Sequence, residues 1–166
     1  MHRESYAEMK LNIEKYCKDF KQGSYVADIG SQDVNGTYKT LIEPRFAYVG
    51  FDRTLGKNVN IVMQGEFYTG LPSDTADILL CGQVLEHCRN PFLLAQEIIR
   101  ITKTGGVLLI VAPFTWVEHK FPIDCWRFLP DGMRLLFPAE QVKCLDTYIT
   151  GADCWFIGEK VQGLIP

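Results

Sequence analysis

The sequence lacks several features that mark particular classes of protein. None of its six cysteines forms a CxxC pair, so we expect no zinc site and no other metal. It has no run of Lys and Arg, and its formal net charge of -3 disfavours tight binding to nucleic-acid phosphates. No apolar run is long enough to span a bilayer, and the opening residues MHRESYAEMK lack the apolar segment of a secretory signal. We therefore expect a reduced, cytoplasmic protein that binds neither nucleic acid nor membranes.

What is present has the composition of an ordinary globular domain. The chain has 166 residues, 47% hydrophobic and 22% charged, which predicts one domain over residues 1–166 with a sizeable core. Segments typical of strands alternate with segments of helical periodicity, as in an α/β fold. The expected strands cover residues 24–29, 46–51, 59–63, 76–81, 107–112, 142–150 and 153–160, the last two as an antiparallel hairpin. The expected helices cover residues 4–20, 37–42, 91–105 and 130–137, the third opened by Asn90 and Pro91 and ended by Gly105.

The N-terminal helix has an apolar face on which Tyr6, Met9 and Ile13 recur at helical spacing. Two interpretations stay open for this face. It covers the sheet as part of the core, or it forms a lid whose aromatic side chains close over a ligand.

The segment VADIGSQDVNG, residues 26–36, reads as a buried strand that breaks into a polar loop at Gly30. In open α/β sheets, ligands bind beyond the carboxyl ends of the strands, and Gly30 lets the backbone approach a ligand closely. Asp52 ends the second strand about 20 residues later, where an acidic side chain accepts hydrogen bonds from a ribose; a turn or helix-cap role is the alternative. The loop Ser31-Gln32-Asp33 has too few glycines for a pyrophosphate, which disfavours a nicotinamide cofactor.

Four motifs in this order resemble the class I S-adenosylmethionine-dependent methyltransferases: VADIGSQDVNG, YVGFD, ADILLCGQVLEH and NPFLLAQEIIRITKTGGVLLIVAP. The resemblance implies a Rossmann-like, doubly wound, seven-stranded and mostly parallel sheet with an antiparallel last strand and an N-terminal capping helix. It also implies S-adenosylmethionine as the cofactor. The family pattern often has a second glycine where this chain has Gln32.

The resemblance also implies the cofactor-binding residues. Asp28 and Gly30 match positions that receive the amino acid half of the cofactor, and Asp52 matches the ribose-binding acid. Glu66 and Phe67 fall near the segment that borders the adenine, and Gln83 lies beside the methionine end. The set of candidates, with two loop neighbours added, is Asp28, Gly30, Ser31, Asp52, Arg53, Glu66, Phe67 and Gln83.

Residues 114–128 follow a central strand and are rich in aromatic and titratable side chains. His119 is the candidate general base of this loop, because histidine titrates in the useful range; a surface-loop histidine is the alternative. Asp124 either orients His119 or pairs with Arg127 and only holds the loop. His87 is expected to be structural, with a backbone group as its partner.

The sequence therefore predicts a methyltransferase that acts on a hydroxyl, or less readily an amine or carboxylate, of a small molecule or sugar. The alternative is a non-catalytic domain of the same fold that binds a nucleoside, a cofactor or a partner. The oligomeric state stays open.

Overall fold

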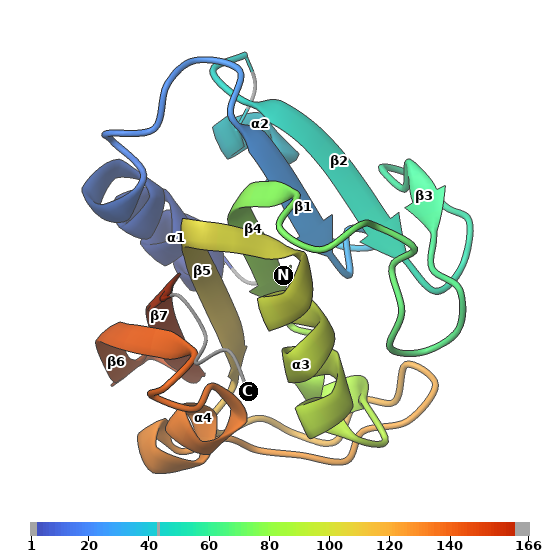
Figure 1. The fold of residues 1–166 in the computed structure, drawn as a ribbon. Helices are drawn as coiled ribbons and strands as arrows, with labels where there is room; N and C mark the ends of the chain where they lie inside the picture. The colour runs from blue at the N-terminus through green and yellow to red at the C-terminus, as the bar shows by residue number, and fades with distance from the viewer. Residues whose placement is uncertain (1–2, 43, 162–166) are drawn as a thin grey trace.

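The structure, a computed structural model, describes residues 3–42 and 44–161, and the chain alternates strands and helices over this length (Figure 1). The strands are β1 (Tyr25–Ile29), β2 (Ala47–Asp52), β3 (Ile61–Val62), β4 (Ala76–Gly82), β5 (Thr102–Pro113), β6 (Val142–Thr150) and β7 (Asp153–Lys160). The helices are α1 (Arg3–Tyr16), α2 (Lys39–Ile42), α3 (Pro91–Ile101), α4 (Pro130–Leu136) and the short 3₁₀ helix η1 (Leu85–His87).

The strands form one seven-stranded sheet in the order β3-β2-β1-β4-β5-β7-β6. β1 to β5 pair in parallel, whereas β7 runs antiparallel to both β5 and β6. The chain order reverses at β1, whose neighbours are β2 and β4, so this is the topological switch point of the sheet. The predicted Rossmann-like sheet with an antiparallel C-terminal strand is confirmed.

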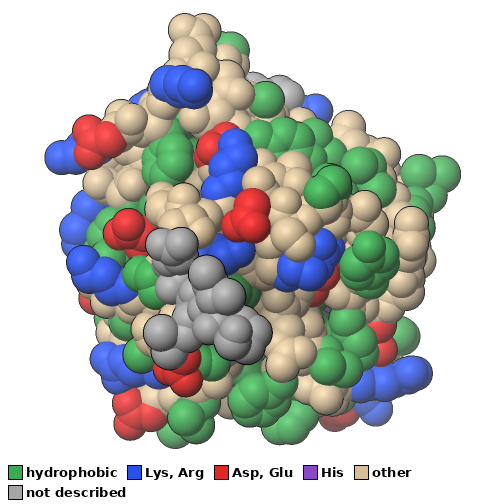
Figure 2. All heavy atoms as spheres, in the orientation of Figure 1, with side chains coloured by type: hydrophobic (Ala, Val, Ile, Leu, Met, Phe, Trp, Pro, Cys, Tyr) green, Lys and Arg blue, Asp and Glu red, His purple; other side chains and the backbone are tan. Residues whose placement is uncertain are grey.

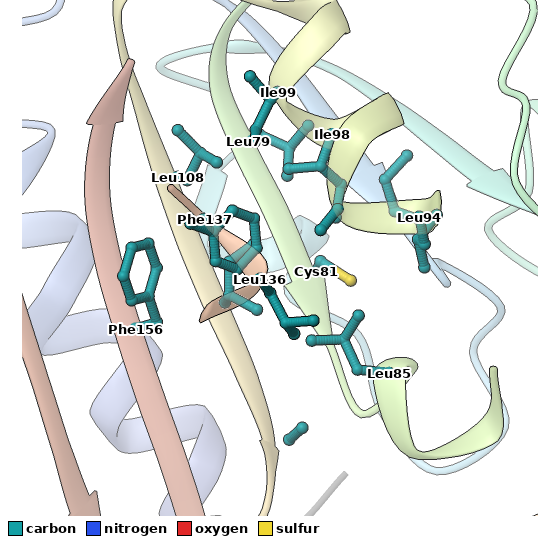
Figure 3. Packing of buried hydrophobic residues seen from close by; sticks show 14 of the residues in the cluster. Leu79, Cys81, Leu85, Leu94, Ile98, Ile99, Leu108, Leu136, Phe137 and Phe156 are labelled. Atoms are coloured by element: carbon teal, nitrogen blue, oxygen red, sulfur yellow. The ribbon is translucent and has the colours of Figure 1, made fainter. Parts of the chain in front are cut away.

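The centre of the sheet is buried on both faces because β1, β4 and β7 are apolar on both sides. Along β4, Leu79 and Cys81 belong to the cluster covered by α3 and α4, while Ile78 and Leu80 belong to the opposite cluster with α1 and α2. Figure 3 shows Leu94 and Ile98 of α3 beside the first of these faces. The result is a three-layer α/β/α architecture whose strands lie in the middle layer.

The N-terminal helix covers the sheet. Met9 and Ile13 are buried in the cluster around β4 and β5, together with Cys17, which follows the helix. The Ser5 hydroxyl donates a hydrogen bond to Asp153, and Asn12 Nδ2 donates to the Tyr148 hydroxyl at 2.8 Å. Of the two interpretations of its apolar face, the structure shows the covering one.

Several element boundaries differ from those predicted. α1 ends at Tyr16, whereas the predicted helix runs to residue 20, and β5 begins at Thr102, five residues before the predicted strand. α3 begins as expected, with the Asn90 side chain accepting hydrogen bonds from two backbone N–H groups, but it ends at Ile101 and not at Gly105. Thr102 turns the chain into an extended conformation while its hydroxyl donates to Ile98 O at 2.7 Å, so Gly105 lies inside β5. β3 keeps only residues 61–62 of the expected five, both exposed at the edge of the sheet.

The surface agrees with the charge balance of the sequence. On the face shown in Figure 2, acidic and basic side chains are interspersed. Within residues 3–42 and 44–161, no helix has the length and apolar character needed to cross a membrane.

Candidate functional site

A cavity of about 310 Å³ lies at the carboxyl ends of β1, β2 and β4. Its walls include the end of β1 with Asp28 and Gly30, the end of β2 with Asp52, and the segment after β4 with Gln83. The 114–128 loop contributes His119 and its two successors in the chain. The cavity therefore occupies the switch point of the sheet, where α/β proteins bind their ligands.

Gly30 turns the chain at the end of β1 with a φ of +80°, a left-handed conformation that favours glycine. A Cβ at this position would lie 2.0 Å from Cγ2 of Val84, which also borders the cavity. The loop then closes through Asp33, whose Oδ1 accepts a hydrogen bond from the Gly36 N–H at 2.8 Å. Asp33 also pairs with Lys57 Nζ at 2.7 Å, so its charge is neutralised away from the cavity.

Gln32 replaces the second glycine of the family pattern without filling the cavity. Its amide oxygen accepts a hydrogen bond from the Thr54 hydroxyl at 3.3 Å. The amide also packs against Gly56, where an added Cβ would meet Gln32 Nε2 at 2.3 Å. The Gln32 side chain therefore lies along the 54–56 segment, although the residue borders the cavity.

Two carboxylates face the cavity from neighbouring strands. Burial raises the pKa of Asp28 to about 7, and the negative charge of Asp52 acts in the same direction. The hydrogen bond that Tyr48 donates to Asp28 Oδ2 at 2.6 Å lowers this pKa and offsets part of the rise. Asp52 accepts hydrogen bonds from the backbone N–H groups of Gln32 at 3.2 Å and Thr54 at 3.4 Å. These long bonds leave acceptor positions of the Asp52 carboxylate available to a ligand.

Of the next four predicted cofactor residues, Ser31, Arg53 and Glu66 border the cavity and Phe67 does not. Ser31 borders the cavity, but its hydroxyl donates to Asn58 O at 3.2 Å. Arg53 also borders the cavity and donates to Phe121 O at 3.1 Å, which links β2 to the 114–128 loop. Glu66 borders the cavity and accepts from the Arg89 N–H at 2.8 Å. Phe67 is not brought there, since it packs against the hydrophobic core beside α3.

Gln83 follows β4 with a φ of +60°, which is uncommon for a residue with a side chain. Its Nε2 donates to Asp153 Oδ1 at 2.9 Å, and this bond ties the cavity wall to β7. Strained backbone of this kind often occurs at ligand sites.

Sequence reasoning missed several residues that line the cavity. Met63, Val84 and Leu94 supply apolar walls, and Tyr38 is buried with a hydroxyl that has no hydrogen-bond partner among the described residues. Their periodicity marks them only as core residues. The one available signal was their position just after strands or at the start of a helix.

The 114–128 loop is fastened to η1 beside the cavity. The Cys125 N–H donates to Glu86 O at 2.7 Å, and the indole of Trp126 donates to Cys88 O at 2.8 Å. His87 Nδ1 lies 2.6 Å from Ile123 O, so the expected backbone partner of His87 is present. The loop (orange in Figure 1) therefore has a defined position across the carboxyl ends of the strands.

Asp124 makes both of the contacts considered for it and does not line the cavity. Its Oδ2 accepts a hydrogen bond from the His119 backbone N–H at 2.7 Å and lies 3.3 Å from His119 Nδ1. Arg127 donates to both of its oxygens, at 2.6 and 2.8 Å. The Arg127 guanidinium holds the pKa of Asp124 well below its usual range, so Asp124 remains charged.

The sequence of residues 24–110, just over half of the chain, matches the family model described as a methyltransferase domain. With the fold and the cavity described above, this match shows that the chain belongs to the S-adenosylmethionine-dependent methyltransferases of class I. S-adenosylmethionine is accordingly its cofactor. No protein with a curated description matches the sequence.

Solved structures share the fold at low sequence identity. YcgJ from Bacillus subtilis is similar, with a TM-score of 0.75 and 14% sequence identity, and the match covers 98% of this chain and 100% of the YcgJ chain. A SAM-dependent methyltransferase from Aquifex aeolicus has a TM-score of 0.66 and 17% identity, covering 97% and 100%. The cyclase SpnF has a TM-score of 0.74 and 12% identity, covering 95% and 81%.

Proposed function

We propose that this protein transfers a methyl group from S-adenosylmethionine to a hydroxyl group of a small molecule or sugar, with residues 1–166 acting as one domain. The observation that carries the proposal is His119, whose ring faces the same cavity as the two carboxylates Asp28 and Asp52. An amine or a carboxylate is a less favoured acceptor, because neither needs a base as much as a hydroxyl does.

The walls of the cavity fit the chemistry of the cofactor. When bound, S-adenosylmethionine supplies a methyl group activated by a positively charged sulfur. In our proposal Asp28 attracts its ammonium group and Asp52 accepts hydrogen bonds from its ribose hydroxyls. Gly30 keeps the wall open for close approach, and Glu66 with Met63 borders the adenine. Ser31, Arg53 and Gln83 support these walls through the hydrogen bonds described above, and we assign no cofactor contact to Phe67.

We assign His119 to removal of the acceptor proton. Its Nδ1 lies 3.2 Å from Val117 O and 3.3 Å from Asp124 Oδ2, and both of these atoms only accept hydrogen bonds. Nδ1 must therefore carry the proton, which leaves a lone pair on Nε2 of the neutral ring. That lone pair takes the hydroxyl proton as the new O–CH₃ bond forms and the S–CH₃ bond breaks. Asp124 acts as a positioning residue, held by Arg127.

The test is a screen of sugars and small hydroxyl, amine and carboxylate compounds with a labelled methyl donor. Once an acceptor is found, His119→Ala should lower turnover by roughly 10²–10⁴-fold, the usual contribution of a general base. Its affinity for S-adenosylhomocysteine should stay within about twofold, since the contact is to the acceptor. Glu118→Ala is the matched control, because Glu118 is an exposed neighbour in the same loop. Near-normal turnover of His119→Ala would assign this histidine to loop structure.

The alternative of a domain that binds the cofactor without methyl transfer predicts binding of S-adenosylhomocysteine and no labelled product from any acceptor class. The similarity to SpnF, described as a cyclase, makes this comparison necessary, because one fold carries several activities. The cytoplasmic setting expected from the sequence stays a prediction.

A further inference from the structure

A buried carboxylate without a partner lies next to the two histidines of the cavity. Glu86 is fully buried in η1, and neither of its carboxylate oxygens has a hydrogen-bond partner among the described residues. Its Oε1 lies 3.7 Å from His87 Nε2 and 4.0 Å from His119 Nε2. A buried carboxylate that is left unpaired is costly, and either a proton or a bound cation relieves that cost.

In both histidines the nitrogen nearer to Glu86, Nε2, is the one without a proton. The carbonyl of Ile123 can only accept from His87 Nδ1, so this nitrogen carries the proton and Nε2 is the free atom. The same reasoning, given above, leaves Nε2 of His119 free. Histidines that bind metals use one ring nitrogen and donate the other to a carbonyl or carboxylate, as these two do.

We propose that Glu86, His87 and His119 form a site for one divalent transition-metal ion of the Zn²⁺ type. Two histidines and one carboxylate are the ligand set of catalytic zinc sites and of non-haem iron sites. One ligand atom from each residue lies within 4.8 Å of the other two. Ligands about 2.0–2.2 Å from zinc in a tetrahedral arrangement are roughly 3.4 Å apart. The two Glu86–histidine separations of 3.7 and 4.0 Å are close to this value, and the third, at most 4.8 Å, has to shorten by up to about 1.4 Å.

The surroundings of the three side chains favour binding. The histidine side chains are 11% and 38% exposed and border the cavity, so an ion has a path of entry and an open coordination position toward it. The hydrogen bonds between η1 and the 114–128 loop hold the two ligand-bearing segments together. The sequence-based expectation of no metal considered cysteine pairs only, and none of these three ligands is a cysteine.

A bound ion would occupy the lone pair that we assign to proton removal, so the two roles of His119 exclude each other. In the loaded protein the ion would instead lower the pKa of an acceptor hydroxyl by direct coordination, and the proton would leave to water in the cavity. This consequence rests on the proposed function, whereas the existence of the metal site is independent of it.

The test measures metal binding without cofactor or acceptor. The full chain is treated with a chelator and titrated with Zn²⁺ by calorimetry, and Co²⁺ is followed by its visible absorption. We expect one ion per chain, no competition from Mg²⁺, and a loss of Zn²⁺ affinity of more than about 100-fold in Glu86→Gln and His119→Ala. Asp124→Asn, which changes the outer partner of His119 and also removes one of the two bonds from Arg127, should cost roughly 10–100-fold. Glu118→Gln and the double variant Cys125→Ser, Cys144→Ser should bind Zn²⁺ like the unmodified chain, because these side chains are exposed outside the cluster.

Failure to bind Zn²⁺ would overturn the proposal. So would binding that survives both ligand substitutions, or binding that only the cysteine double variant abolishes. If Glu86→Gln does not fold, as judged by circular dichroism, the half-exposed His119→Ala decides alone. Zinc binding without any methyl transfer would leave this site standing and remove the proposed function. Full methyl transfer by a chain that binds no zinc would overturn the metal site and leave the proposed function standing.

Discussion

Asp52 offers the sharpest test of the cofactor site, because its carboxylate borders the cavity while holding few bonds of its own. The two backbone N–H groups that it accepts from lie 3.2 and 3.4 Å away, so they contribute little to stability. A hydrogen bond to a charged group is worth about 1.5–3 kcal/mol, and 1.4 kcal/mol corresponds to about a tenfold change in affinity. Asp52→Ala should therefore weaken S-adenosylhomocysteine binding by at least about tenfold if the carboxylate holds the ribose.

The assay is calorimetry with S-adenosylhomocysteine, with the unfolding temperature measured alongside. Asp52→Asn separates charge from shape, since its amide oxygen still accepts the Gln32 N–H, and its loss of affinity should be smaller than that of the alanine variant. Asp74→Asn is the matched control: Asp74 pairs with Lys160 on the surface, and asparagine tolerates its positive φ. An affinity of Asp52→Ala within about twofold of the unmodified chain would refute the ribose assignment.

Three further predictions address the loop, the pH dependence and the core. Gln32→Gly should keep S-adenosylhomocysteine affinity within a few-fold, and a gain of about a hundredfold (about 2.7 kcal/mol) in calorimetry would mean that the native loop obstructs the cavity. The folded protein keeps the Asp28 proton up to about pH 7, whereas the unfolded chain releases it at the lower pKa of an ordinary aspartate, so stability should fall as the pH rises between these two values. Asp28→Asn does not titrate and can still accept the hydrogen bond from Tyr48, so thermal unfolding of this variant should show a smaller decline over the same pH range. Glu97→Gln should cost about 1–3 kcal/mol in urea unfolding, because the amide oxygen can still accept from Thr69 but an NH₂ group replaces Oε2, the buried acceptor of the Arg100 Nε–H at 2.7 Å; an unchanged midpoint would contradict this.

The sequence predicted the centre of the sheet well because β1, β4 and β7 are apolar and buried on both faces. β6 and β7 were predicted with their observed bounds, since Gly151 marks the turn between them. The end of α3 was wrong because the pair Gly105-Gly106 looks like a helix terminus, whereas a single hydroxyl bond at Thr102 ends the helix earlier. A local contact of this kind leaves no periodic signal.

The cofactor-binding residues and the cluster of Glu86, His87 and His119 differ in how far the sequence predicts them. Positions at the ends of strands, such as Asp28 and Asp52, converge because parallel strands end at one edge of the sheet. Phe67 lies in an irregular segment where no such rule applies, and it is partly buried against the core. The approach of Glu86 to His119 depends on hydrogen bonds between η1 and a distant loop, which spacing along the chain does not encode.

The charges around the cavity imply a preference between the cofactor and its product. Asp28, Asp52 and Glu66 border the space, and both basic residues on its wall have partners: Arg53 donates to a backbone carbonyl of the 114–128 loop, and Lys120 Nζ lies 3.2 Å from Glu118 Oε1. A donor that carries a sulfonium is attracted by these carboxylates, and its positive charge also favours the ionised form of Asp28. The thioether left after methyl transfer lacks the sulfonium charge and loses that attraction. The carboxylates that we assign to cofactor recognition therefore also favour replacement of the product by a fresh donor after each reaction.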